Sequence, residues 1–324
     1  MASWISRRLL QALFVIVAMT VIVFIGVHAI GNPVDILISP EANLEERERT
    51  IAMLGLDKPL WEQYLRFVWG ALHLDLGRSF VFNESALKLI AQRMPATLEL
   101  AAAAMLLAVM IGVPLGLYAG LRPGAWMART VMAGSIFGFS LPTFWVGLML
   151  IMVFAVHFGW LPSTGRGATR TLFGIPWSFL TVDGLRHMAM PTFNLALGNI
   201  SLVLRLTAAG TRENMSMDYV KFARAKGLSP ARVVLLHVLK NIIIPIITVV
   251  GMEFGSVVAF ATVTETVFSW PGMGKLIIDS INVLDRPVIV AYLMMIVAMF
   301  VVINLAVDLL YTVLDPRIRL GGGR

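Results

Sequence analysis

The sequence predicts an all-α membrane protein with six membrane-spanning helices and with both termini in the cytoplasm. Composition gives the first indication, because hydrophobic residues make up 58% of the 324 residues and charged residues only 14%. Soluble domains usually contain about 45–50% apolar and about 25% charged residues. A chain of this composition could not hide its apolar surface inside one globule, so the bilayer must act as its solvent.

Six apolar runs give the second indication, since each is long enough to cross the hydrocarbon core as a helix of about 20 residues. The predicted spans are Leu9–Ile30, Ala96–Leu121, Val131–Phe158, His187–Thr207, Ile242–Thr264 and Val288–Val313. The first run follows Arg7 and Arg8, as in a secretory signal, but its apolar stretch is too long for one. Val27-His28-Ala29 is also a poor cleavage site, so we interpret this run as a retained helix.

The positions of the basic residues give the third indication. With the N-terminus inside, the cytoplasmic segments carry 14 of the 26 lysines and arginines but only three of the 19 carboxylates. This asymmetry follows the positive-inside rule. The net charge of +7 is therefore explained by membrane orientation and does not indicate nucleic-acid binding. The absence of cysteine excludes disulfides and thiolate metal sites.

The expected organisation divides the chain at the membrane boundaries. It comprises a cytoplasmic N-terminus (1–8), a first helix (9–30), an external region (31–95), a five-helix core (96–313) and a cytoplasmic tail (314–324). Two long loops interrupt the core, an external one at 159–186 and a cytoplasmic one at 205–241. In the external region, helical patterns are expected at Glu41–Leu54 and Trp61–Leu72, where the aromatic residues favour an ordered cap on the membrane surface.

The most informative stretch is the middle of the cytoplasmic loop, which predicts a short helix, a sharp turn and a second helix. Asp218 or Ser216 can cap the start of the first helix, and Gly227 suits the left-handed position that ends it. Ser229-Pro230 is typical of the N-cap and first turn of the next helix.

The short helix is expected to be amphipathic, with Tyr219, Phe222 and Ala223 on one apolar face. Such a helix could lie on anionic lipid, or a soluble partner could hold it in a groove. The residues by themselves leave these two interpretations open.

A resemblance to a known family favours the second interpretation. Asp218-Tyr219-Val220 followed by Ala223-Arg224-Ala225-Lys226-Gly227-Leu228 is similar to the cytoplasmic-loop signature of ABC importer permeases. The general signature has Glu-Ala-Ala, then Gly after three residues, whereas this chain has Lys221-Phe222-Ala223 before Gly227. That departure resembles the dipeptide/oligopeptide/nickel permease family, whose peptide branch shares it.

Eight further motifs extend the resemblance over nearly the whole chain and in the order found in the first, B-type, permease of a pair. They are Arg7-Arg8-Leu9-Leu10, Leu56-Asp57-Lys58-Pro59-Leu60-Trp61, Asp75-Leu76-Gly77-Arg78-Ser79, Arg93-Met94-Pro95-Ala96-Thr97-Leu98-Glu99, Ser140-Leu141-Pro142-Thr143-Phe144-Trp145, Glu265-Thr266-Val267-Phe268-Ser269-Trp270-Pro271-Gly272-Met273-Gly274, Asp308-Leu309-Leu310-Tyr311 and Leu314-Asp315-Pro316-Arg317-Ile318-Arg319.

The resemblance implies a type I ABC importer permease fold in the bacterial inner membrane. It implies a subunit that moves di- or oligopeptides by alternating access, with nickel chelates, glutathione or sugars as alternative cargo. The implied partners are a second homologous permease, two ATPase subunits, an external substrate-binding protein and membrane lipid, without nucleic acid. No catalytic residue, cofactor or metal is expected in this chain, because ATP and Mg²⁺ belong to the ATPases. The residues implied to couple to an ATPase are Tyr219, Ala223, Arg224, Lys226, Gly227 and Leu228.

Gly272-Met273-Gly274-Lys275 looks like part of a phosphate-binding loop but lacks its first glycine and its final Ser or Thr. Among carboxylates in the predicted spans, Glu99 is close enough to a span end for snorkelling or pairing. Glu253 lies deeper, and we hypothesise that it faces a translocation cavity or a partner helix. A stand-alone secondary transporter is the competing class, and the lack of an internal repeat or charge relay disfavours it.

Overall fold

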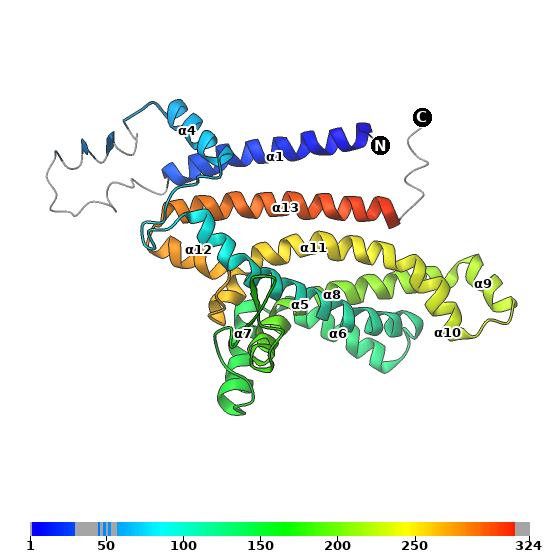
Figure 1. The fold of residues 1–324 in the computed structure, drawn as a ribbon. Helices are drawn as coiled ribbons and strands as arrows, with labels where there is room; N and C mark the ends of the chain where they lie inside the picture. Colours follow the sequence, from blue (N-terminus) through cyan, green and yellow to red (C-terminus); the bar gives the residue numbers. More distant parts are fainter. Residues whose placement is uncertain (1, 30–44, 46–47, 50, 53–56, 315–324) are drawn as a thin grey trace. The chain divides into compact units, whose positions relative to one another are not determined.

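The computed structural model describes residues 2–29, 45, 48–49, 51–52 and 57–314, and helices dominate it (Figure 1). In chain order the elements are α1 (Ala2–Ala29), α4 (Leu60–Leu72), α5 (Ala86–Leu121), α6 (Trp126–Ser140), α7 (Thr143–Leu150), the π-helix η1 (Ile151–His157), β1 (Arg170–Leu172), β2 (Ile175–Trp177), α8 (Val182–Ser216), α9 (Asp218–Ala225), α10 (Pro230–Arg232), the π-helix η2 (Val233–Val238), α11 (Leu239–Val267), α12 (Met273–Asn282) and α13 (Arg286–Leu314). Most of the predicted helix at Glu41–Leu54, and the tail after Leu314, lie outside the described residues.

The chain forms two compact units. One contains Met1–Pro95 and Gly272–Val302, and the other contains Ala96–Pro271 and Ile303–Arg324. In the first unit α4 packs against α1, where the Thr20 and Tyr64 hydroxyls lie 2.8 Å apart. This contact gives the second helical stretch of the predicted external region a fixed partner.

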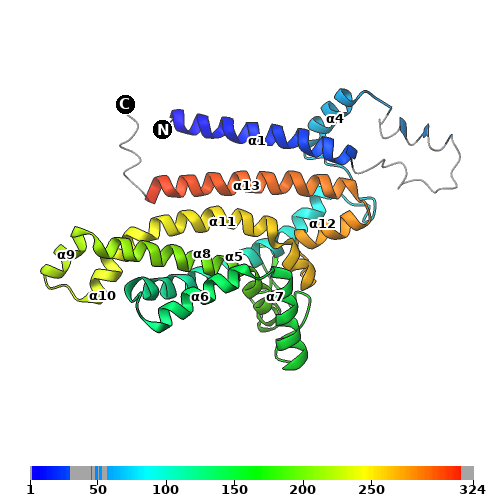
Figure 2. The same cartoon turned by 180° about the vertical axis from the view of Figure 1, so that it is seen from behind.

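The second unit is built on the pairing of α8 with α11, which lie side by side in both views (Figures 1 and 2). Helix α6 packs along α8 as well. Alanines allow α5 to approach α8 closely, because Ala104 and Ala108 are buried against Ala196 and Ile200.

The third predicted span is not one straight helix. Helices α6 and α7 meet at an angle of 104° instead of continuing through Val131–Phe158. Pro142 disfavours the helical conformation of the residue before it, and Leu141 is accordingly extended, with φ −81° and ψ 136°. The predicted third span is therefore bent at this proline.

Among the described residues, four helical segments are long and apolar enough to cross a membrane, namely α5, α8, Pro230–Val267 and Arg286–Leu309. The bent α6–α7 pair, with its η1 extension, adds a fifth crossing if it counts as one span. In α1 the apolar part found among the described residues is Leu13–Gly26, which is shorter. The count of six spans and the inside position of both termini stay predictions.

A row of glycines sets the distance between α5 and α8. Gly112, Gly116 and Gly120 are spaced by four residues, which places them on one face of α5. A Cβ on Gly116 would lie 2.6 Å from both the Leu204 carbonyl oxygen and the Thr207 Cβ. Small residues at this spacing let membrane helices pack backbone to backbone.

Replacing Gly116 by alanine is therefore expected to destabilise the second unit by about 1–3 kcal/mol, the usual cost of overpacking. The measurement is thermal unfolding of the purified chain in detergent. Gly134→Ala is the matched control, because a Cβ there meets no atom within 4 Å. Equal unfolding midpoints for the two variants would contradict the close packing of α5 on α8.

Candidate functional site

Two features of the second unit are candidates for function, and the first is the short helix α9. It spans eight residues, Asp218–Ala225, at the end of the α8–α11 pair (Figure 1). Its N-cap residue is Met217, in extended conformation and without a side-chain cap. The expected caps are absent: Ser216 donates back to the Glu213 carbonyl and Asp218 pairs with Lys221 at 2.8 Å.

The turn after α9 has the predicted left-handed glycine. Gly227 has φ +77°, its N–H donates to the Arg224 carbonyl at 2.9 Å, and the Leu228 N–H donates to the Ala223 carbonyl at 3.3 Å. These bonds satisfy carbonyls that the helix end leaves free. The chain then turns into α10, with Ser229 in the N-cap position and Pro230 at its first turn, as predicted.

One face of α9 is fixed to its own fold. Val220 and Ala223 are buried in a cluster with Val233, Val238 and Ile242 from η2 and α11. Tyr219 and Leu228 pack on the edge of this cluster, and the Tyr219 hydroxyl donates to Asn214 Oδ1 at 2.6 Å. The orientation of α9 is therefore linked directly to the helices it joins.

The opposite face of α9 is exposed and carries an aromatic ring. Phe222 is 62% exposed, and the Lys226 Nζ lies 4.5 Å from its ring centroid. The expectation that Phe222 shares a face with Ala223 was therefore wrong, because Ala223 is buried and Phe222 is exposed. Of the six residues implied for coupling, Arg224, Lys226 and Gly227 are exposed, whereas Tyr219, Ala223 and Leu228 contact the chain itself. Helical spacing placed Phe222 on one face with Tyr219 and Ala223, and the resemblance did not include it among the coupling residues.

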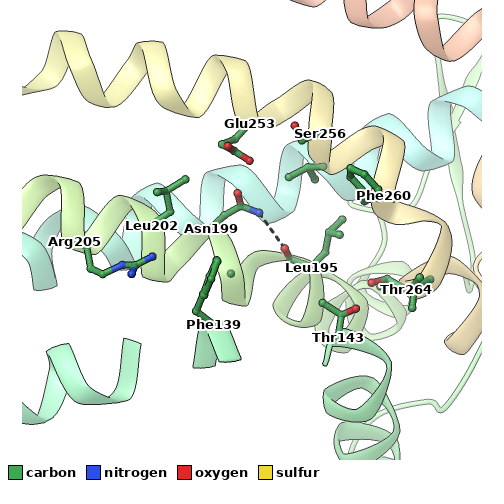
Figure 3. Close-up of a pocket in the computed structure, with 13 residues that line it drawn as sticks. Phe139, Thr143, Leu195, Asn199, Leu202, Arg205, Glu253, Ser256, Phe260 and Thr264 are labelled. Atoms are coloured by element: carbon green, nitrogen blue, oxygen red, sulfur yellow. Dashed lines mark hydrogen bonds between the residues drawn. The ribbon is translucent and has the colours of Figure 1, made fainter. Parts of the chain in front are cut away.

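The second candidate feature is a cavity of about 520 Å³ between α8 and α11, closed on one side by the α6–α7 bend (Figure 3). Its lining residues come from these four helices. They are Phe139, Thr143, Leu195, Gly198, Asn199, Leu202, Arg205, Glu253, Ser256, Val257, Phe260, Val263 and Thr264. The bend at Pro142 brings Phe139 and Thr143 into the wall from the two sides of the break.

Two opposite charges share this cavity. Glu253 projects from α11, and Arg205 projects from the facing α8. The sequence assigned Arg205 to a cytoplasmic loop at 205–241, but α8 continues without a break to Ser216. The Arg205 guanidinium lies 5.2 Å from the Phe139 ring centroid, and its Nε donates to the Ser201 carbonyl at 3.3 Å.

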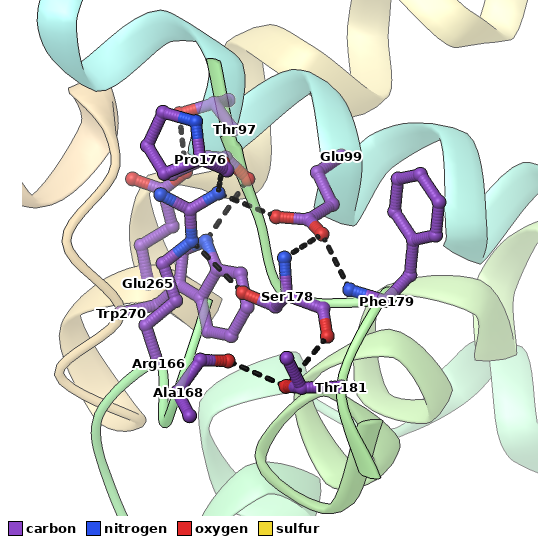
Figure 4. Close-up of polar contacts among 11 residues, drawn as sticks. Thr97, Glu99, Arg166, Ala168, Pro176, Ser178, Phe179, Thr181, Glu265 and Trp270 are labelled. Carbon is purple, nitrogen blue, oxygen red and sulfur yellow. Dashed lines mark hydrogen bonds and ion pairs between the residues drawn. The ribbon is translucent and has the colours of Figure 1, made fainter. Parts of the chain in front are cut away.

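A buried network next to the cavity-forming helices holds the loop at 159–186 (Figure 4). The Glu99 carboxylate accepts from Arg166 Nη2 at 2.6 Å and from the N–H groups of Ser178 and Phe179 at 2.6 and 2.9 Å. Its side chain is 2% exposed. Glu99 is therefore paired, as expected from its place near a span end, and it has a structural role.

The motif that follows α11 joins the same region. Trp270 is fully buried, and its Nε1 donates to the Ala96 carbonyl at 2.9 Å. The Thr97 hydroxyl donates to the buried Glu265 carboxylate at 2.6 Å. Arg166 lies over the Trp270 ring at 5.7 Å. Two of the motifs that carried the resemblance thus stabilise one packed corner.

The described residues contain no group of three or more His, Asp or Glu side chains arranged to hold a metal ion. Lys275, from the incomplete phosphate-loop pattern, pairs with Asp279 at 2.8 Å. The two candidate sites therefore consist of a projecting helix and a cavity with two charged side chains.

Comparison with protein families defines the class of this chain. Residues 112–320 match the family described as binding-protein-dependent transport system inner membrane component, and residues 1–101 match the N-terminal part of such membrane components. The chain belongs to this family, which confirms the resemblance found in its motifs. It is a multi-pass protein of the bacterial inner membrane.

Individual relatives match from end to end. The dipeptide transport system permease protein DppB of Escherichia coli K12 is 36% identical, over 98% of this chain and 99% of that protein. The di/tripeptide permease DppB of Pseudomonas aeruginosa UCBPP-PA14 is 38% identical over the same shares. The glutathione permease GsiC of Escherichia coli K12 is 35% identical, again over 98% and 99%.

Solved structures define the fold. The MetNI methionine ABC transporter, in an inward-facing conformation, aligns with a TM-score of 0.53 over 70% of this chain and 96% of the solved chain. Sequence identity is 18%, so this likeness bears on the fold alone. It confirms the expected type I ABC importer permease fold.

Proposed function

We propose that this chain is one of two permeases that enclose a peptide path through the inner membrane, driven by separate ATPase subunits. An external binding protein delivers the peptide, and the chain itself hydrolyses no ATP and holds no cofactor. The relatives are permeases named for dipeptides, di/tripeptides and glutathione, which supports a short peptide as cargo. The second permease is taken to be a homologue of this chain.

The observation that carries the proposal is the two-faced construction of α9. Its inner face is buried against η2 and α11, so a displacement of α9 is passed to the long helices. Its outer face offers an exposed aromatic ring flanked by cations, and a partner's groove can hold such a short helix through a few anchors. A helix of two turns is too short to bind a bilayer strongly through one apolar face.

The interface is tested with Phe222→Ala. Aromatic anchors at interface centres cost about 2 kcal/mol or more when truncated, so the affinity for the ATPase subunits should fall roughly 30-fold. The measurement is retention of the ATPases on affinity-tagged chain purified in detergent. Phe173→Ala is the matched control, since Phe173 is 93% exposed but lies on the β1–β2 hairpin. Normal ATPase retention by Phe222→Ala would show that α9 is not the ATPase contact.

A further inference from the structure

We propose that the cavity between α8 and α11 binds a zwitterionic peptide by its two ends, with its ammonium group at Glu253 and its terminal carboxylate at Arg205. The inference rests on the proposed function and deepens it, because it assigns two residues of the path to the ends of the cargo. Three observations support it: within the described residues the two charged side chains have no ion-pair partner, they lie on facing helices of one cavity, and most of the other lining residues are apolar.

The two charged groups are not neutralised by their own fold. Within the part of the chain that the structure describes, no hydrogen bond or ion pair engages the Glu253 carboxylate, and Glu253 and Arg205 do not form an ion pair with each other. Arg205 makes one hydrogen bond, to the Ser201 carbonyl, and contacts the face of Phe139. Among the described residues, no carboxylate pairs with its terminal guanidinium nitrogens.

Unpaired charges are costly within the membrane-spanning part of a protein. Ionisable side chains within spans face a cavity and pair there with something, because the hydrocarbon offers them no solvation. An Arg fork binds a carboxylate in bidentate fashion, and a carboxylate accepts from an ammonium group. A ligand with one positive and one negative end would satisfy both residues at once.

The placement of the groups suits a short peptide. Asn199, Leu202 and Arg205 follow one another along one face of α8, and Glu253 lies on the facing α11 (Figure 3). A cavity of about 520 Å³ is within the usual range of roughly 300–1,000 Å³ for small-molecule sites. Asn199 donates its Nδ2 hydrogen to the Leu195 carbonyl at 3.3 Å. This bond leaves its carbonyl oxygen as an acceptor for a peptide N–H.

Most of the other lining residues are apolar and distinguish little between cargo side chains; the uncharged polar ones besides Asn199 are Thr143, Ser256 and Thr264. Leu195, Leu202, Val257, Phe260 and Val263 offer surfaces without directional groups. Apolar walls discriminate weakly between side chains of similar size, whereas a buried polar pair rejects a ligand that leaves it unpaired. The site would therefore accept many side chains while selecting for free ends.

One end of the cavity is held in place by a buried hydrogen bond. Asn194 Nδ2 donates to Thr264 Oγ1 at 2.9 Å and so links α8 to α11. Two residues before Glu253, α11 approaches α13 closely, since a Cβ on Gly251 would lie 2.6 Å from Val307 Cγ2. The two charges are thus carried by helices whose separation is fixed by packing.

The test combines variants of Glu253 and Arg205 with peptides that are blocked at one end or the other. It uses the purified complete transporter, without the external binding protein. Isothermal titration compares Ala-Phe with its N-acetyl and its C-amide derivatives. The wild type should bind free Ala-Phe roughly tenfold or more tightly than either derivative, as expected for losing one hydrogen-bonded charge. Glu253→Gln should bind the N-acetyl derivative as tightly as free Ala-Phe but still bind the C-amide more weakly. Arg205→Gln should bind the C-amide as tightly as free Ala-Phe but still bind the N-acetyl derivative more weakly.

Two kinds of control variant test whether the charge and its position in the cavity are what matter. Glu253→Asp and Arg205→Lys keep the charges and should retain both preferences. Glu213→Gln and Arg212→Gln make the same chemical changes on exposed positions of α8 outside the cavity, and should also retain both.

Several outcomes would overturn the inference. In the first, the wild type shows no saturable binding of Ala-Phe. In the second, the wild type binds the acetyl and amide derivatives as tightly as free Ala-Phe. In the third, the neutral variants Glu253→Gln and Arg205→Gln both keep the full preference for free Ala-Phe. Loss of complex assembly in the neutral variants, with terminus preference intact in what assembles, would assign the two charges to contacts with the second permease. Failure of the proposed function is distinguished separately, because the wild-type transporter would then show no ATP-dependent peptide uptake.

Discussion

Replacing Gly227 by proline is expected to abolish transport while leaving the chain inserted in the membrane. Proline fixes φ near −65°, whereas Gly227 has φ +77°, and proline also removes the N–H that donates to the Arg224 carbonyl. An incompatible proline costs about 3 kcal/mol or more, so the turn must rearrange. The rearranged turn re-aims α9 relative to α10, and an ATPase that holds α9 can no longer move α11. The measurement is substrate-stimulated ATP hydrolysis and peptide uptake by the assembled transporter.

Gly227→Asn separates the turn conformation from the mere loss of glycine. Asparagine tolerates the left-handed region, and a Cβ at this position meets no atom within 4 Å. This variant should keep most of the uptake. Normal uptake by Gly227→Pro would remove the turn after α9 from the mechanism, and equal loss in both variants would show that the backbone conformation is not what matters.

The second large effect is expected from Glu99→Ala. This change leaves the Arg166 guanidinium, whose side chain is 12% exposed, without its carboxylate, and leaves two backbone N–H groups without an acceptor. Breaking a buried ion pair by removing one partner costs about 3–5 kcal/mol. The expected results are a markedly lower unfolding temperature in detergent and faster proteolysis in the loop at 159–186.

Two comparisons make this result specific. Glu84→Ala breaks an exposed pair with Lys88 at 3.3 Å, which is worth about 1 kcal/mol or less. The double variant Glu99→Ala/Arg166→Ala should recover part of the loss, because no unpaired buried charge remains. If Glu99→Ala unfolds like Glu84→Ala, the network is not what holds the loop.

The sequence predicted those features that depend on local chemistry. The positive φ of Gly227 and the start of α10 at Pro230 follow from residue types that have few conformational alternatives. The long apolar runs predicted α5, α8, α11 and α13 because the bilayer requires them. Proline in an apolar run is compatible with a kinked span as well as with a break, so the bend at Pro142 does not follow from the sequence alone.

The cavity and the buried network depend on contacts between distant residues, which periodicity does not encode. Glu99 and Arg166 are 67 positions apart in the sequence, and nothing in either segment marks the other as its partner. Arg205 was counted as a loop cation because hydropathy falls before α8 ends. On a helix that continues to Ser216, the same residue faces Glu253's helix and becomes a candidate for substrate contact.

We expect this chain to transport only as part of an ATP-driven assembly. The decisive measurement is uptake of a radiolabelled dipeptide into proteoliposomes that contain the chain and its second permease, with or without the ATPases. The prediction is accumulation against a gradient when the ATPases, ATP and the binding protein are all present, and none when the ATPases are omitted. Uptake by the chain without ATPases would contradict this dependence and identify a stand-alone transporter.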